Sequence, residues 1–349
     1  MNLNQTQTLL EAISRSFPPQ TLLRDTFFPN PKTFVTKTVL MDYRKGNRQM
    51  SPFVAKGGSG VNVNRTGFVT KEYEPPMMAP ERPTTAGDIE ARGFGENVFS
   101  SKTPAQREME LRAQDMADLI AMNTRRIEWM CSQTMVFGQF QVAGYADDGK
   151  TQLIDTVTFS DWTQKMIMSG SDMWTNLSAD AYGQLQMASQ SVSRAAGIVP
   201  DVGIMSFKTQ NWFMQNAGIK DILKVPNLSN LSMMNLAPRI TSPGVVRIGM
   251  IESLNLELYG YDGIYQDDAG AIQQYIPDGY VVIGARGRGS QLFGAVTQLE
   301  FDDVYRTYEG SNVPKVWSEQ GKDTKMLRVA SKAVVKPETT DDWYTLKVF

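Results

Sequence analysis

Adjacent carboxylates are the first candidates for chemistry in this sequence. Aspartate pairs occur at 147–148, 267–268, 302–303 and 341–342, and carboxylate oxygens are typical ligands of divalent cations. Most of these pairs stand beside turn signals, where aspartate is favoured because its side chain bonds to nearby backbone. None has the Asp-x-Asp-x-Asp-Gly spacing of a calcium-binding loop. We therefore interpret the pairs as turn residues and expect no metal site.

Two glycine-rich segments are candidate sites for a phosphate or a nucleophile. The segment Gly284-Ala-Arg-Gly-Arg-Gly289 follows an expected strand, but it breaks the Gly-x-Gly-x-x-Gly spacing and no long helix follows it. The segment Gly57-Gly-Ser-Gly60 does not match the Gly-x-Ser-x-Gly nucleophile elbow. We expect neither a phosphate-binding loop nor an activated serine.

The chain contains no histidine. This absence removes the Ser/His/Asp and Cys/His nucleophile arrangements and the usual zinc ligand sets. The single cysteine, Cys131, cannot form a disulfide within the chain, and we interpret it as a small buried hydrophobic residue. Carboxylate or lysine chemistry is the catalytic alternative that stays open. The sequence favours a protein that is not an enzyme and needs no cofactor.

Charge and hydropathy exclude further classes of function. The 349 residues include 35 Lys and Arg against 37 Asp and Glu, and the isoelectric point is about 5.5. Tight nucleic-acid binding usually shows a basic stripe, which is absent from this sequence. No apolar run approaches the ~20 residues that span a membrane, and the N-terminal segment does not resemble a signal peptide. We expect cytoplasmic synthesis and no direct reading of DNA sequence.

The longest predicted element is a helix over residues 104–137. Thr103 and Gln106 fit a capping box, and Gly138 stands at the expected C-cap. At 1.5 Å per residue this helix would be about 50 Å long, so we interpret it as a spine that carries β structure. Its charged face, on which the pattern places Glu128, should be exposed or lie at subunit contacts, and its apolar face should pack on a sheet. The core residues expected on that apolar face are Met116, Ile120, Ile127 and Met130.

Strand-like sequence flanks this helix on both sides. Residues 1–32 are typical of an arm, with apolar anchors that should lie across their own body or a neighbouring subunit. Residues 33–80 predict a projecting hairpin. In residues 172–300 helices precede strands, which favours an α+β fold over a doubly wound parallel sheet. The last 50 residues return to a β pattern. Within the hairpin, the candidate strands lie at 33–40, 49–55, 61–63 and 67–73.

An arm and a projecting hairpin stabilise a monomer poorly, but they tie neighbouring subunits together well. The sequence therefore predicts a subunit that assembles with copies of itself. The candidates for loop-mediated contacts between subunits are Lys56, Phe68, Lys71 and Tyr73.

Three stretches in a fixed order carry a family resemblance. The first runs from Ser193 to Phe213, as a helix end, a strand and a helix start. The second is Tyr275-Ile-Pro-Asp-Gly-Tyr-Val-Val-Ile-Gly284, and the third combines Val313 to Trp317 with Pro337 to Phe349. In this order they resemble the major capsid protein E family of tailed bacteriophages, the lambda type, which has the Hong Kong 97-like capsid fold.

The resemblance implies an α+β shell subunit with four parts. These are an N-terminal arm (1–32), an extension loop (33–80), a peripheral domain (81–171 and 301–349) that contains the spine helix, and an axial domain (172–300). It also implies a major head protein. Its pentamers and hexamers would form an icosahedral shell around packaged double-stranded DNA, without sequence-specific binding.

The partners implied by the resemblance are other copies of the chain, a scaffold protein, a portal protein and a decoration protein, with no membrane. The implied location is the virion, after synthesis and assembly in the host cytoplasm. Lambda-type shells typically rely on decoration proteins, so we expect no covalent crosslink between subunits. Three alternatives stay open: the shell of a cell-encoded nanocompartment with the same fold, a histidine-free enzyme, and another virion component such as a tail-tube protein.

Overall fold

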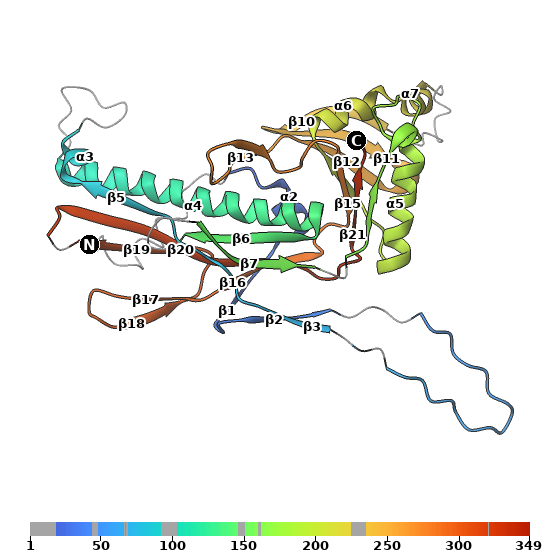
Figure 1. Cartoon of the computed structure of the whole chain (residues 1–349), viewed down its shortest axis with the longest axis horizontal. Coiled ribbons are helices and arrows are strands. Elements are labelled where there is room, and N and C mark those ends of the chain that lie inside the picture. The colour runs from blue at the N-terminus through green and yellow to red at the C-terminus, as the bar shows by residue number, and fades with distance from the viewer. Residues whose placement is uncertain are drawn as a thin grey trace.

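A long helix, two sheets and a projecting loop make up the fold, as the computed structural model in Figure 1 shows. The helix and the larger part of one sheet run side by side, and a lobe with further helices stands at one end of them (Figure 1). The described residues are 19–43, 48–65, 67, 69–91, 103–145, 151–159, 162–224, 235–319 and 321–349.

Helix α4 (Pro104–Phe137) has the bounds that its sequence predicts. At its start, the Gln106 N–H donates to the Thr103 hydroxyl at 3.3 Å and the Thr103 N–H donates to the Gln106 side chain at 2.9 Å. At its end, Gly138 adopts a φ of +68°. A side chain there would also collide with the Trp162 ring, which lies 2.2 Å from the position of a Cβ. Both ends of the spine are thus fixed by local sequence.

Strand β20 (Thr324–Pro337) organises the six-stranded sheet. Its 14 residues pair along their length with four other strands, all antiparallel. Met116 and Leu119 of α4 pack on this sheet against Val316, Leu327 and Val329. The other strands are β1 (Asn30–Phe34), β4 (Met77–Met78), β5 (Glu81–Thr85), β16 (Gly289–Gly294) and β19 (Val313–Ser318).

The second sheet has seven strands in the order β10-β11-β12-β9-β15-β21-β8. Helices α5 (Ala181–Ala196), α6 (Phe207–Gln215) and α7 (Ala217–Lys224) cover one face through a buried cluster, and the end of α4 covers the other. The strands are β8 (Lys165–Ile167), β9 (Val202–Met205), β10 (Asn235–Ser242), β11 (Val245–Ile251), β12 (Leu256–Tyr261), β15 (Tyr280–Gly284) and β21 (Trp343–Lys347).

Short helices and two-stranded hairpins complete the architecture. Helices α2 (Leu22–Phe27) and α3 (Ala86–Glu90) precede α4, and Gly170–Asp172 and Glu252–Leu254 form 3₁₀ turns. The hairpins are β2 (Val39–Tyr43) with β3 (Val69–Tyr73), β6 (Gln139–Tyr145) with β7 (Thr151–Thr158), β13 (Ile264–Gln266) with β14 (Ile272–Gln274), and β17 (Val296–Leu299) with β18 (Tyr305–Tyr308).

The sheets divide the chain differently from the boundaries expected above. Strand β21, expected in the peripheral part with residues 301–349, pairs with β15 in the seven-stranded sheet. Strand β16, expected in the axial part with residues 172–300, pairs with β20 in the six-stranded sheet. Hydrogen bonds between distant segments decide which sheet a strand joins, and those partners leave no trace in the local pattern. The domain boundaries themselves stay a prediction.

The projecting segment also differs from its expected form. Residues 33–34 belong to β1, which pairs in parallel with β16 rather than extending into the loop. The expected strands at 49–55 and 61–63 do not form, since the structure assigns no strand to these described residues. Within the described residues of the segment, the paired part is its base, where β2 and β3 form a two-stranded hairpin.

Candidate assembly surfaces

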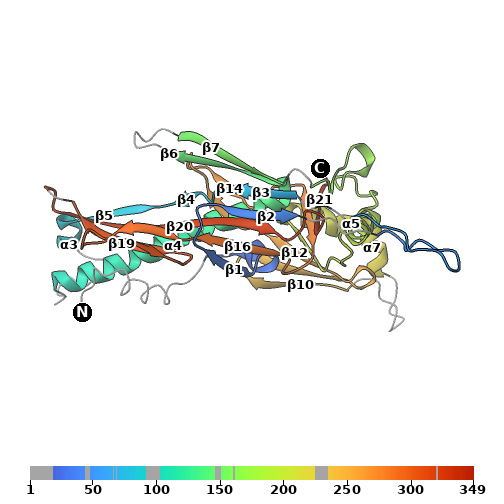
Figure 2. The same cartoon turned by 90° about the horizontal axis from the view of Figure 1, so that it is seen from below.

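The loop between β2 and β3 carries exposed apolar side chains on residues 48–65. In both views this part of the chain extends away from the body (Figure 1, Figure 2). Gly57, with a φ of +84°, turns the chain, and the Gly58 N–H donates to the Ala55 carbonyl oxygen at 2.8 Å. The exposed hydrophobic residues on the loop are Met50, Phe53, Val54, Val61 and Val63, and Phe53 has no contact that reduces its exposure. A set of exposed hydrophobic residues on one segment marks a contact surface for another chain.

The four candidate contact residues of the loop lie in different surroundings. Lys56 is exposed at the loop turn, Lys71 is half-buried on β3, and Phe68 falls outside the described residues. Tyr73 contacts its own chain, because its hydroxyl donates to the Thr158 carbonyl oxygen at 3.1 Å and its ring lies 6.4 Å from the Phe159 ring. Tyr73 therefore anchors the base of the loop instead of lying on its free surface.

A second exposed apolar surface lies between α4 and the β13–β14 hairpin. Met122 of α4 and Ile264 and Ile272 of the hairpin are each about half exposed or more, and they line one hollow. The Arg126 guanidinium crosses this hollow, pairing with Asp268 at 2.6 Å and lying 5.3 Å from the centre of the Trp129 ring. Neighbouring hydrophobic groups of this kind are typical of surfaces that bind other chains.

The expected core residues of α4 divide between two buried clusters. Met116 is buried against the six-stranded sheet, with Ile120 half-buried beside it. Ile127 and Met130 are buried in the largest cluster, which joins residues of both sheets and of α2. The helix thus contacts the six-stranded sheet with its first half and the junction of the two sheets with its second half.

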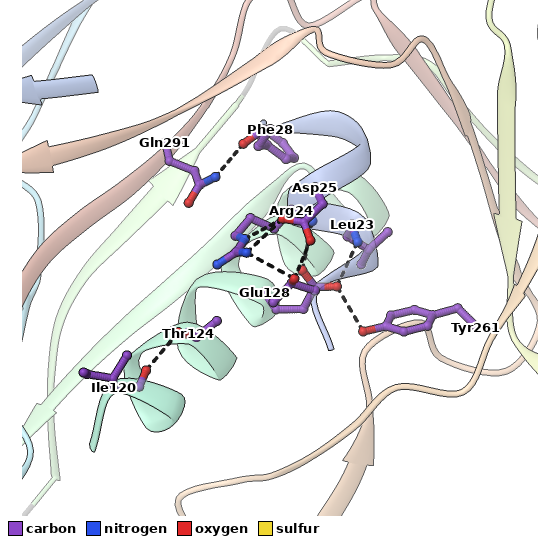
Figure 3. Close-up of polar contacts among 10 residues, drawn as sticks. Leu23, Arg24, Asp25, Phe28, Ile120, Thr124, Glu128, Tyr261 and Gln291 are labelled. Atoms are coloured by element: carbon purple, nitrogen blue, oxygen red, sulfur yellow. Dashed lines mark hydrogen bonds and ion pairs between the residues drawn. The ribbon is translucent and has the colours of Figure 1, made fainter. Parts of the chain in front are cut away.

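Glu128 was expected on the charged outer face of α4, and this expectation was wrong. Its side chain is fully buried at the junction of α2, α4 and β12 (Figure 3). The carboxylate accepts hydrogen bonds from the Leu23 and Arg24 N–H groups, both at 2.9 Å, and from the Tyr261 hydroxyl at 3.0 Å. The helical pattern could not indicate this, because α2 and β12 cover a side of α4 that a single packing face would leave exposed.

The Glu128 side chain, which belongs to α4, caps the N-terminus of helix α2. The first N–H groups of a helix have no partner within it, and the N-cap residue Thr21 makes no capping bond to α2. The Glu128 carboxylate takes that role for Leu23 and Arg24 (Figure 3). Burial raises the pKa of Glu128 to about 7, while these hydrogen bonds oppose the rise.

Parts of the three stretches that carry the family resemblance meet at one place in the lobe, while Val313 to Trp317 lies on β19 in the six-stranded sheet. Strands β9, β15 and β21 are neighbours in the seven-stranded sheet. The Ser206 hydroxyl that begins α6 donates to Asp278 at 3.0 Å, and the Gly279 N–H donates to the Thr209 hydroxyl at 3.0 Å. The Gly279 carbonyl oxygen accepts the Val348 N–H at 2.7 Å. The Pro-Asp-Gly turn therefore joins the start of α6 to the end of the chain.

Residues Gly144 to Thr151 fit the Gly-x-x-x-x-Gly-Lys-Thr pattern of a P-loop, which the sequence reasoning missed. A P-loop joins a strand to a helix whose N-terminus binds phosphate. This segment instead joins β6 to β7, which pair as antiparallel strands. Because no helix begins after the Gly-Lys-Thr sequence, we assign no phosphate site to it.

The described residues hold no cluster of three or more carboxylate or thiol side chains arranged to bind a metal ion. One aspartate pair that lies within them has a turn role: Asp267 accepts the N–H groups of Ala269 at 3.0 Å and Ala271 at 2.8 Å. In the same part of the chain, no helix combines the length and hydrophobicity needed to cross a membrane.

Comparison with known proteins places most of the chain in one group. A family model described as phage major capsid protein E matches residues 5–348. The major capsid protein of Escherichia phage lambda is 23% identical over 328 residues, and that of Escherichia phage N15 is 22% identical, each match covering 92% of both chains. A crystal structure of a putative capsid protein from an E. coli CFT073 prophage superimposes over the full length of both chains, with a TM-score of 0.71 and 17% identity.

Proposed function

The chain belongs to the phage major capsid protein E family, and from this membership we propose that its copies form the pentamers and hexamers of an icosahedral phage head. It is a major capsid protein of a tailed phage with the Hong Kong 97-like fold, and it self-assembles into a shell. The observation that carries the proposal is the family match over nearly the whole chain. The exposed apolar loop supports it, since a monomer gains nothing from such a loop.

We propose that the loop of residues 48–65 binds a neighbouring subunit in the shell. Its hydrophobic side chains are between about half and fully exposed, and completely burying an exposed one would contribute up to roughly 1.5–3 kcal/mol. The parts proposed for the shell subunit are the arm, the extension loop, a peripheral part built on the six-stranded sheet, and an axial part built on the seven-stranded sheet.

Family membership alone supports the other partners that we propose. They are a scaffold protein and a portal protein during assembly, and a decoration protein on the shell, which encloses double-stranded DNA. The proposed location is the virion, after synthesis and assembly in the host cytoplasm. We propose no catalytic role and no cofactor. The nanocompartment shell is the weaker alternative because the matching family is one of phage capsid proteins.

Electron microscopy and sedimentation of the full chain expressed with its scaffold test the proposal. We expect closed shells together with pentamers and hexamers. A monodisperse monomer at high concentration with scaffold present would contradict it. If shells purified from cells enclose an enzyme instead of phage DNA, this would favour the nanocompartment alternative.

The variant Phe53→Ser tests the role of the loop in assembly. Phe53 is fully exposed, so the monomer should unfold at the same urea concentration as the wild type while the yield of shells falls at least tenfold. Phe53→Leu keeps a hydrophobic side chain and should restore most of the yield. Normal assembly of Phe53→Ser would exclude this contact without affecting the family assignment.

A further inference from the structure

Helix α2 is held on the body by a small set of contacts. Leu23, Phe27 and Phe28 are buried in the same cluster as Ile127 and Cys131 of α4. The polar contacts include the two N–H groups that bond to Glu128, the Thr26 carbonyl oxygen, which accepts the Gly287 N–H at 2.9 Å, and the Phe28 carbonyl oxygen, which accepts the Gln291 side-chain N–H at 2.6 Å (Figure 3). Of these polar partners, only Glu128 can change its charge.

Among the described residues, no cation contacts Glu128 directly. The titratable and charged groups around it are Arg24 and Asp25 on α2, Cys131 on α4, and Tyr261 and Tyr275 from the seven-stranded sheet and the turn before β15. The Arg24 guanidinium bonds to Asp25 at 2.9 Å and to the Thr21 hydroxyl at 3.2 Å, so it acts on Glu128 only at longer range. A fully buried carboxylate without a bound cation is costly in its charged form.

We propose that α2 is a strap whose release from α4 is coupled to the loss of one proton from Glu128. With α2 in place, the protonated carboxyl can donate to the Tyr261 oxygen, because a tyrosine hydroxyl also accepts hydrogen bonds. Its other oxygen still accepts an N–H group of α2. When α2 lifts, water reaches Glu128, the carboxyl ionises, and the proton passes to the solvent.

Linkage fixes the direction of this pH dependence. Burial raises the pKa of Glu128 from 4.5 to about 7 while α2 is in place, and the exposed residue returns to its ordinary value once α2 lifts. Between these values the lifted state binds fewer protons, so a higher pH favours lifting. The opening constant should rise up to tenfold per pH unit in this interval and should level off above it. Acidification therefore tightens the strap and alkaline conditions loosen it.

Cys131 provides a built-in reporter of α2 release, since it is the only cysteine of the chain and is fully buried beside α2. The unassembled full chain would be exposed to a thiol-reactive disulfide reagent at several pH values between 5.5 and 8. Each labelling rate would be divided by the rate for the urea-unfolded chain at the same pH, which removes the titration of the thiol itself. The normalised rate should rise steeply with pH up to about 7.

Two glutamate-to-glutamine variants distinguish the release of α2 from general effects of pH on the protein. Glu128→Gln cannot ionise, so its normalised labelling should not depend on pH, whatever its absolute rate. Glu110→Gln makes the same change at an exposed position of α4 and should keep the wild-type slope. A pH-independent rate in the wild type, or an equal slope in Glu128→Gln, would overturn the proposal.

Amide hydrogen exchange shows whether the opening is local. The Leu23 and Arg24 amides, corrected for intrinsic rates, should follow the same pH dependence as Cys131 labelling. The amides of the buried strand β9 should exchange at least tenfold more slowly. If the amides of α2 and β9 exchange with equal opening constants, Cys131 reports global unfolding and the strap is refuted. This measurement on the wild type also decides the question if Glu128→Gln fails to fold.

Discussion

Gly279 shows how a single backbone position connects two distant parts of the lobe. Its φ of +84° is a conformation that side chains with a Cβ rarely adopt. A Cβ at this position would also lie 2.6 Å from the Phe349 carbonyl oxygen. The Pro-Asp-Gly sequence was recognised as a family feature, and the structure supplies its physical reason: only glycine lets the end of the chain approach this turn.

Replacing Gly279 by alanine should therefore destabilise the lobe. We expect Gly279→Ala to lower the free energy of unfolding by roughly 1–3 kcal/mol, from the strained φ and the contact with Phe349. Urea unfolding followed by circular dichroism measures this change. Gly60→Ala is the matched control, because a Cβ on Gly60 meets no atom within 4 Å. Equal stability of the two variants would show that the chain end can move away without cost.

Glu128 marks the limit of sequence reasoning at this scale. Its neighbours along the helix include arginines and aspartates that are exposed or half-exposed, so periodicity placed it with them. The burial comes from α2 and β12, which lie about 100 or more residues away in the chain. A lone glutamate whose partners are two backbone N–H groups and one distant tyrosine hydroxyl has no recognisable spacing, since any residue can supply a backbone N–H group.

At the scale of elements, the long helix was the feature best predicted from sequence. A capping box, an N-terminal proline and a C-terminal glycine are local signals, and they fixed both of its ends. The strands were predicted less well. The apolar stretches at 49–55 and 61–63 have strand-like composition but no partner strand, whereas β20 forms a long strand because four others pair with it. Composition alone does not reveal pairing.

Ile127 offers a direct test of α4 as the spine. It is buried where α4 meets the junction of the two sheets, so Ile127→Asp would bury an unpaired charge. We expect a loss of at least ~3 kcal/mol in unfolding free energy and no assembled particles. Particle yield and urea unfolding measure the two effects.

Met109→Asp is the matched control on the same helix. Met109 is exposed, so the charged side chain stays in water and should change stability by less than about 0.5 kcal/mol. Ile127→Val should cost only about 1 kcal/mol, as expected for one buried methyl group. Normal particles from Ile127→Asp would mean that α4 does not support the core as described.

At the scale of the whole molecule, the two sheets share one hydrophobic core. The largest buried cluster contains Val334 and Phe293 from the six-stranded sheet together with Ile204, Val282 and Trp343 from the seven-stranded sheet. Separate domains would each have a core of their own, with few contacts crossing between them. The named parts of a shell subunit are therefore regions of one packed body in this chain.

This shared core predicts that the body unfolds cooperatively. Hydrogen exchange of β9 and of β20, which belong to different sheets, should report global opening constants that agree within about threefold. In urea, tryptophan fluorescence and far-ultraviolet circular dichroism should change at the same midpoint. Two separated transitions, one for each sheet, would contradict a common core.

The pairing of β20 determines when, during translation, the chain can complete the six-stranded sheet. Met77 and Met78 pair with Lys332 and Ser331, and the strand that begins at Asn30 pairs with one that begins near Ser290. During translation the early strands leave the ribosome long before their partners exist. A nascent or prematurely terminated chain cannot close the six-stranded sheet. We therefore expect chains that terminate before β20 to be unable to enter growing particles, so that the order of synthesis would itself select complete subunits.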